Sequence, residues 1–328
     1  NSLSHTSILS LHKDMQGNIW VGTYYGGVNV FNPDKNNHSF YCAEPLREDC
    51  LSFPVVGKMT EDSAGNVWIC TEGGGLNCYH GDTGVFSRYM YHKGDQGTLG
   101  SNNVKSIFYR KENNRLYAGT HLGGLFVLDL KSNKGHTLHH VTGDPASLPH
   151  EIVNDIQEYK DGIAMLTQGG PVFFDPVTEK FSPLTDDPSV QKLISREYAF
   201  ETFLIDSRHR MWLAVGGGGI VCVNLSSSKV TQYMADSEKD TLTVGRYKTV
   251  HIFEDNKGDI YFSTIGAGIF KYQEKQDTFK SYGTTNGVLP SNYCYYICES
   301  ARDNCLLVLH GKGLSIFDRE KEVTEETY

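Results

Sequence analysis

The sequence predicts an all-β chain, folded as a seven-bladed β-propeller of four-stranded antiparallel blades. One segment recurs along the whole chain, and "KDMQGNIWVGTYYGGVNVFN", "EDSAGNVWICTEGGGLNCYH" and "EDNKGDIYFSTIGAGIFKYQ" are its clearest copies. Successive copies are 45 to 49 residues apart, as measured between Trp20, Trp68, Tyr117, Ala164, Trp212, Tyr261 and Leu306. Four strands per copy and seven copies are typical of a propeller, whereas a parallel β-helix has repeats of about half this length.

Each copy contains four short apolar runs that are bounded by turn residues. In the first copy these runs are 7–14, 18–23, 28–31 and 38–42, and they are rich in β-branched and aromatic residues. The second run is apolar on both faces, which indicates a strand packed between neighbouring sheets. The tail 321–328 falls where the fourth strand of the last blade belongs. We expect one domain, residues 1–328, with blades at 3–50, 51–98, 99–147, 148–192, 193–241, 242–288 and 289–328.

Turn residues recur at fixed places within the copies. The D-x-x-G turn between the first two runs needs a residue at positive φ, which Gly17, Gly65 and Gly258 supply. We expect Asp161 and Asp303 to take this role in their copies. A glycine-rich segment such as "YYGG" or "EGGG" then predicts a hairpin.

Several side chains that could carry chemistry recur at one place in the repeat, which favours a structural role. The carboxylates at this turn are expected to bond their own backbone rather than to catalyse, and they are Asp14, Asp62, Asp206 and Asp255. Trp20, Trp68 and Trp212 are expected to pack between blades.

The eight cysteines fall far short of a disulfide scaffold. Cys70 and Cys78 are expected roughly opposite each other on one hairpin, as buried free thiols at a place that requires small side chains. Cys42 and Cys50 are the best disulfide candidate in an oxidising compartment.

Composition argues against several classes of partner and chemistry. A net charge of −9 without a long basic run disfavours nucleic acid and anionic membrane surfaces. No stretch approaches 18 consecutive apolar residues, so no transmembrane helix is expected. The histidine-rich segment 136–140 lacks the spacing of a metal site. No nucleophile elbow or phosphate loop is present. We therefore expect no catalytic residue, no metal and no cofactor.

Strand directions place the connection into each first strand and the hairpin between the second and third strands at one end of each sheet. We call this the hairpin end, and the end with the D-x-x-G turns the turn end. Variable residues gather at the hairpin end, where a rigid scaffold usually carries binding groups. The ligand-binding candidates there are Tyr24, Tyr25, Arg196, Glu197, Arg246 and Tyr247. Tyrosine rings suit the apolar faces of sugars, and arginine suits a carboxylate or sulfate.

The motifs "VLPSNYCYYICES" and "GNIWVGTYYGGVNVFNP" resemble the two-component regulator propeller repeat, and "VFFDP" carries its end. The resemblance implies the periplasmic sensor of a hybrid two-component histidine kinase of gut Bacteroidetes, in which two such propellers precede a β-sandwich, a membrane helix and the kinase. It implies as partners an oligosaccharide, acidic ones included, or a second propeller, and a homodimer in the intact sensor. It supplies no motif for ligand residues.

Three functional classes follow. The first is a non-catalytic sensor module that binds a glycan fragment or a partner propeller. The others are a carbohydrate-active hydrolase or lyase on a propeller scaffold, and a structural spacer; fold alone does not choose among them. Asn1 lies inside a repeat, so we expect the chain to be a fragment of a longer protein whose kinase domain lies elsewhere.

Overall fold

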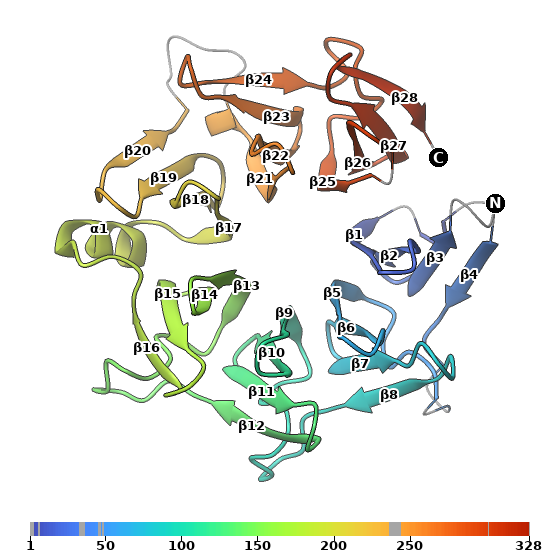
Figure 1. The fold of residues 1–328 in the computed structure, drawn as a ribbon, viewed down its shortest axis with the longest axis vertical. Coiled ribbons are helices and arrows are strands. Elements are labelled where there is room, and N and C mark those ends of the chain that lie inside the picture. Colours follow the sequence, from blue (N-terminus) through green and yellow to red (C-terminus); the bar gives the residue numbers. More distant parts are fainter. Residues whose placement is uncertain are drawn as a thin grey trace. The chain divides into compact units, whose positions relative to one another are not determined.

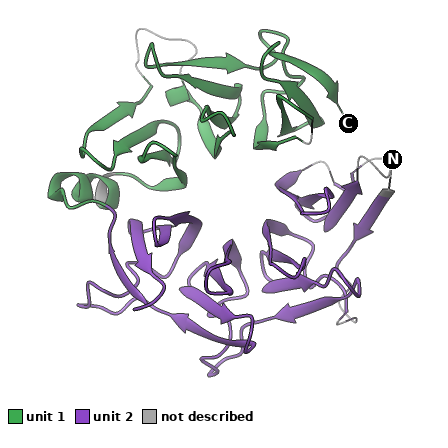
Figure 2. Cartoon of the chain, viewed as in Figure 1, with its two compact units in different colours: residues 1–2, 185–328 green, residues 3–184 purple. Residues whose placement is uncertain are grey.

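The predicted fold class is confirmed: the chain is a seven-bladed β-propeller whose blades are four-stranded antiparallel sheets. The computed structural model describes residues 3–5, 7–32, 37–44, 47, 49–235, 244–300 and 302–327, and the backbone alone for 37, 196 and 197. Within these residues each sheet is a meander of four consecutive strands (Figure 1). The chain divides into two compact units, residues 3–184 with four sheets, and residues 185–328 together with 1–2, with three (Figure 2).

The first unit contains sheets one to four. Their strands are β1 (Ile8–Lys13), β2 (Ile19–Thr23), β3 (Val28–Asn32) and β4 (Asn37–Tyr41); β5 (Val56–Glu61), β6 (Val67–Thr71), β7 (Leu76–Tyr79) and β8 (Phe86–Tyr89); β9 (Val104–Arg110), β10 (Arg115–Thr120), β11 (Leu125–Asp129) and β12 (Lys134–Leu138); β13 (Val153–Tyr159), β14 (Gly162–Thr167), β15 (Gly170–Asp175) and β16 (Lys180–Pro183). The first strands of successive sheets contact one another.

The second unit contains sheets five to seven. Their strands are β17 (Phe200–Ile205), β18 (Arg210–Val215), β19 (Ile220–Asn224) and β20 (Val230–Tyr233); β21 (Lys248–Glu254), β22 (Ile260–Ile265), β23 (Gly268–Gln273) and β24 (Thr278–Tyr282); β25 (Cys294–Glu299), β26 (Cys305–His310), β27 (Gly313–Asp318) and β28 (Val323–Thr327). The last strand is the tail that the sequence predicts.

Within the described ranges, three short helical segments interrupt this pattern. They are the helix α1 (Pro188–Lys192), the π-helix η1 (Leu193–Glu197) and the 3-10 helix η2 (Val244–Arg246). Asp187 caps α1, because its side chain accepts hydrogen bonds from the amides of Ser189 and Val190, and Pro188 occupies the first turn. The sequence prediction missed these segments, which are too short to show a helical period.

The core lies between neighbouring sheets, where the second strands are buried on both faces. The three tryptophans are each at most 3% exposed. Trp20 packs with residues of the second sheet, Trp68 with the third and Trp212 with the sixth. Their predicted packing role is therefore confirmed.

The turn carboxylates cap their turns as predicted and also hold the tryptophans. Asp14 Oδ1 accepts hydrogen bonds from the amides of Gln16 (3.0 Å) and Asn18 (2.8 Å), while its Oδ2 accepts one from Trp20 Nε1 at 2.8 Å. The same 2.8 Å indole bond recurs in Asp62–Trp68 and Asp206–Trp212. The sequence analysis missed this second role, although the constant spacing of six residues was visible.

Positive φ angles occur at Gly17, Gly65 and Gly258, as expected. The assignment of Asp161 and Asp303 is wrong, because Lys160 (φ 53°) and Asn304 (φ 59°) take the left-handed conformation. In the fourth sheet Tyr159 pairs with Gly162, so only two residues remain for the loop, and its first residue carries the positive φ.

In the first, second, third and sixth sheets, a glycine of the second hairpin fastens the sheet to the next one. Gly27, Gly75, Gly124 and Gly268 have positive φ, and a Cβ at these positions would lie only 2.1 to 2.3 Å from a carbonyl oxygen. Their amides donate to carbonyls at the start of the following sheet, in the pairs Gly27–Pro54 (3.0 Å), Gly75–Asn102 (2.8 Å), Gly124–Glu151 (2.9 Å) and Gly268–Asn292 (2.8 Å). We call this bond the glycine clasp.

The cysteines are free thiols. Cys70 and Cys78 are buried, as expected, but they do not face each other, because Cys78 pairs with Trp68 and Cys70 with Leu76. Cys42 and Cys50, the disulfide candidate, also carry free thiols. The need for small side chains at the Cys70 position is confirmed at Gly22, where a Cβ would lie 2.7 Å from Val56 of the next sheet.

Candidate functional site

The hairpin end of the first unit presents an aromatic pair next to an ion pair. Tyr24 and Tyr25 are 40% and 60% exposed, and their rings meet edge-on at 4.5 Å. Tyr25 has a φ of 73°, an uncommon conformation for a side chain of this size. A hydrogen bond to Tyr25 raises the pKa of Tyr24, and the charge of nearby Glu72 adds to the rise. Glu72 Oε1 lies 2.6 Å from Lys105 Nζ, a lysine in strand β9 that sequence reasoning missed.

The remaining candidates belong to the second unit. Arg246 ends η2 and is exposed. Tyr247 is half-buried, its ring lies 6.2 Å from that of Phe270, and it covers Gly266. Tyr247 therefore has a packing role. Arg196 and Glu197 end η1, and their side chains lie outside the described part of the structure. Among the candidates, Tyr24 and Tyr25 are therefore in ring contact, and Arg246 is the chain neighbour of Tyr247.

Other residues at the hairpin end stabilise the fold through hydrogen bonds or burial. The carbonyls of Asn102 and Asn292 accept glycine clasps, and Asn102 Oδ1 also accepts from the amide of Tyr91 at 2.7 Å. His310 is fully buried, and its Nε2 lies 2.7 Å from Ser315 Oγ. Burial lowers the pKa of His310 to about 4.

A polar cavity of about 230 Å³ lies at the turn end, between the first two sheets. It is lined by Asp14, Gln16, Asn18, Trp20, Val30, Asn32, Ser39, Tyr41, Gly65, Val67, Tyr79 and Gly81. The hydroxyls of Tyr41 and Tyr79 are hydrogen-bonded at 3.0 Å, and burial together with this bond raises the pKa of Tyr41. The sequence analysis did not foresee the cavity, because it placed the candidates at the opposite end of the sheets.

The described residues offer no group of three or more His, Cys, Asp or Glu that is arranged to hold a metal ion. In the histidine-rich segment, His136 Nε2 lies 2.9 Å from Glu179, and His139 Nδ1 lies 3.1 Å from Glu151. Burial raises the pKa of Cys78 to about 12, so this thiol is protonated at neutral pH and is a poor nucleophile.

Comparison with solved structures shows that the chain has the fold of known β-propellers. It matches a crystal structure described as the extracellular domain of the hybrid two component system BT3049 of B. thetaiotaomicron, with a TM-score of 0.70, 18% identity, and coverage of 99% of this chain and 47% of that one. PorZ, a surface component of the type-IX secretion system of Porphyromonas gingivalis, matches with a TM-score of 0.68, 14% identity and coverage of 97% and 47%. The Myceliophteria thermophila Cps50 (Swd1) β-propeller domain matches with a TM-score of 0.64, 10% identity and coverage of 97% and 99%. At these identities the matches show the propeller fold alone.

The repeat family is recognised from the sequence itself. Residues 2–25 match the family model of the two component regulator propeller, which confirms the resemblance drawn from the repeat motifs. No curated protein matches the chain. The chain spans about half the length of the first two solved structures, 47% of each.

Proposed function

We propose that this chain is a non-catalytic, extracytoplasmic sensor module of a hybrid two-component histidine kinase, located in the periplasm. The match of residues 2–25 to the regulator propeller family carries this proposal. The fold shared with an extracellular domain of such a system agrees with it. Among the described residues, no helix combines the length and apolar character needed to cross a membrane.

The ligand of the module is an oligosaccharide, acidic ones included, and it meets the hairpin end. The exposed Tyr24–Tyr25 pair offers aromatic faces of the kind that stack on sugar rings. Arg246 is exposed close by Tyr247 and offers a planar donor fork for a carboxylate or sulfate. Because the chain carries a net charge of −9, an acidic glycan needs such local positive groups.

A second propeller, within the intact sensor or across a homodimer, is the other partner that this surface suits. Two large aromatic side chains that are 40% and 60% exposed are also what a protein partner buries at the centre of an interface. In that case Tyr24 and Tyr25 act in the relay of the signal rather than in its detection.

The experiment changes Arg196 and Arg246 to alanine and titrates an acidic and a neutral oligosaccharide. Loss of affinity for the acidic sugar alone is expected. Matched controls change Lys13 and Arg208, which lie at the turn end. If binding survives the first pair and is lost with the second, the hairpin end is not the ligand site. Release of reducing ends from either sugar, abolished by a single carboxylate substitution, would make the chain an enzyme instead.

A further inference from the structure

The cavity between the first two sheets has a counterpart between the fifth and sixth sheets, built from the same aromatic residues. Trp20 lies 6.1 Å from the ring of Tyr41 and 5.0 Å from that of Tyr79. At the equivalent repeat positions, Trp212 lies 6.2 Å from Tyr233 and 4.9 Å from Tyr272, with closely similar interplanar angles.

The frame around the two sites is also the same. In both, the tryptophan donates to the turn aspartate at 2.8 Å. In both, a glutamate at the end of the next sheet's first strand accepts from the backbone of the turn: Glu61 from the amide of Met15 at 2.7 Å, and Glu254 from the amide of Ser207 at 2.8 Å.

In the fifth and sixth sheets, this frame holds a guanidinium group of the chain itself. The Arg210 guanidinium lies 5.1 Å from the ring centroid of Trp212 and 5.5 Å from that of Tyr272, in cation–π contact with both. Its Nε donates to Asp206 Oδ2 at 2.7 Å, and its Nη1 lies 3.3 Å from Glu274. Arg208 also pairs with Glu274.

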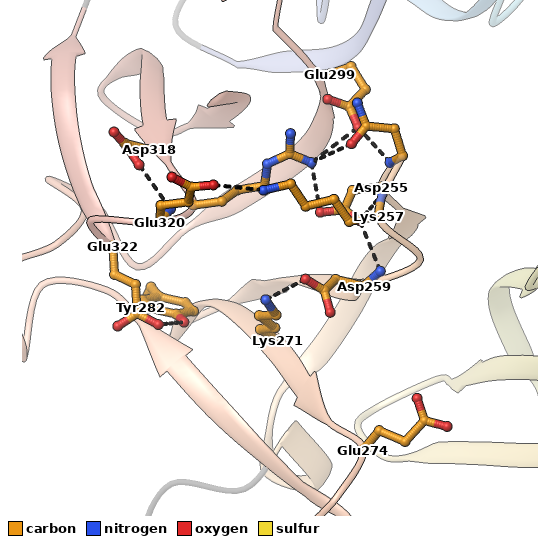
Figure 3. Close-up of polar contacts among 12 residues, drawn as sticks. Asp255, Lys257, Asp259, Lys271, Glu274, Tyr282, Glu299, Asp318, Glu320 and Glu322 are labelled. Carbon is orange, nitrogen blue, oxygen red and sulfur yellow. Dashed lines mark hydrogen bonds and ion pairs between the residues drawn. The ribbon is translucent and has the colours of Figure 1, made fainter. Parts of the chain in front are cut away.

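Guanidinium groups also pair with carboxylates between two further pairs of sheets. Between the sixth and seventh sheets, Arg319 Nη1 donates to Asp255 Oδ2 at 2.8 Å and lies 3.4 Å from Glu299; Figure 3 shows this region, with Asp255 and Glu299 labelled. Between the third and fourth sheets, Arg115 begins β10 just as Arg210 begins β18, and its Nη1 lies 3.4 Å from Glu179. Between the second and third sheets, Leu130 stands where Glu274 stands and packs against the cluster of Trp68.

The first pair of sheets differs in the residues that would fill the frame. Asn18 stands where Arg210 stands, Gln16 where Arg208 stands, and Gly81 where Glu274 stands. Asn18 Nδ2 donates to Asp14 Oδ2 at 2.7 Å, so it reproduces the bond of the Arg210 Nε and ends there. The volume that the guanidinium head and the glutamate fill elsewhere is therefore left as the cavity.

We propose that this cavity binds a guanidinium group supplied from outside the chain, on a small molecule or on an arginine side chain of another protein. Its lining carries the negative charge of Asp14, which attracts a cation although its oxygens already accept bonds from Gln16, Asn18 and Trp20. The rings of Trp20 and Tyr79 and the oxygen-bearing side chains of Ser39, Tyr41 and Asn32 also line it. No lysine or arginine lines it, so an anion finds no counter-charge there. This site is separate from the hairpin end, and it does not depend on the sensor function.

The test uses the indole N–H signals of the three tryptophans, which nuclear magnetic resonance resolves and which single Trp→Phe variants assign. Ethylguanidinium is the probe, propylammonium is the matched cation without a planar fork, and glucose is the neutral control. Ethylguanidinium is expected to shift the Trp20 signal in a saturable manner, and to leave those of Trp68 and Trp212 in place. An arginine-containing peptide that shifts the Trp20 signal at lower concentration would point to a protein as the source of the group.

Two sets of variants make the outcome decisive. N18R supplies an internal guanidinium and should abolish the response, whereas N18A, which leaves the cavity open, should keep it. The double variant R210N/E274G opens the second site, so the Trp212 signal should begin to respond to ethylguanidinium. The proposal fails if the Trp20 signal stays in place, if all three signals move together, or if glucose shifts the Trp20 signal as strongly as ethylguanidinium does.

Discussion

The sixth sheet is the place where the tryptophan–aspartate bond is replaced, and this substitution can be tested directly. Tyr261 stands where the first, second and fifth sheets have Trp20, Trp68 and Trp212, so Asp255 Oδ2 receives no indole N–H. Arg319 of the seventh sheet donates to it instead, and the two side chains are 4% and 0% exposed. We predict that Arg319→Met destabilises the protein and that Tyr261→Trp restores part of the loss.

The magnitudes follow from the contacts. Removal of one partner of a buried ion pair costs roughly 3–5 kcal/mol. Asp255 keeps its backbone bonds from Lys257 and Asp259, both 2.9 Å, so the lower end, about 3 kcal/mol, is expected. A hydrogen bond to a charged group contributes about 1.5–3 kcal/mol, which is what an indole at position 261 can return. In the wild-type background the same change overpacks a fully buried position and costs roughly 1–3 kcal/mol.

The assay is urea unfolding of the four proteins of this double-mutant cycle, followed by far-ultraviolet circular dichroism, because the new tryptophan alters the fluorescence. The expected coupling free energy between the two changes is about 2 kcal/mol or more, in the direction of rescue. R302M is the control, since Arg302 pairs with Glu326 at the surface and such pairs contribute at most about 1 kcal/mol. A coupling energy below about 0.5 kcal/mol would show that indole and guanidinium do not serve the same carboxylate.

Three further outcomes are expected. Trp68→Ala should lower the free energy of unfolding by roughly 3–5 kcal/mol, since the indole is buried between sheets; an unchanged melting temperature with lost ligand binding would contradict this. Gly75→Ala should destabilise more than Gly94→Ala in thermal unfolding, because both glycines have positive φ but only at Gly75 would the Cβ lie 2.3 Å from a carbonyl oxygen; equal losses would remove steric contact as the cause. Because burial lowers the pKa of His310 to about 4 from the usual 6.5, the unfolded state takes up a proton first, so stability should fall as the pH drops from about 6.5 to 4, by up to 1.36 kcal/mol per pH unit. His310→Gln should flatten this dependence and His92→Gln should not, and urea midpoints between pH 7 and pH 4.5 would decide it.

The repeat made the fold predictable, because a fixed period reports the strands, the turns and the buried anchors together. Trp20, Trp68 and Trp212 could be assigned to the core before any coordinates, since a ligand contact has no reason to recur. The pairing register was harder to predict: the offset of Cys70 from Cys78 and the shift from Asp161 to Lys160 depend on which residues of each hairpin lie opposite each other.

The candidate sites were harder to predict from the sequence than the fold. The exposure of Tyr24 and Tyr25 could be predicted from strand direction. The cavity could not, because it arises where Asn18 and Gly81 have shorter side chains than Arg210 and Glu274 at the equivalent positions. A missing side chain becomes visible only against its counterpart, about four repeats away in the sequence. Arg210 and Glu274 are 64 residues apart in the sequence, so neither residue alone indicates that the two fill the space between the fifth and sixth sheets.

The glycine clasp joins main-chain atoms only. Evolution therefore constrains the glycine that donates the bond but not the side chain of the residue that accepts it. The side chains of Pro54, Asn102, Glu151 and Asn292 differ in size and charge, although the four carbonyls do the same work. Point substitutions in these entry segments therefore leave the fastening between sheets in place. Selection can rewrite the recognition surface residue by residue, provided that the clasp glycines stay fixed.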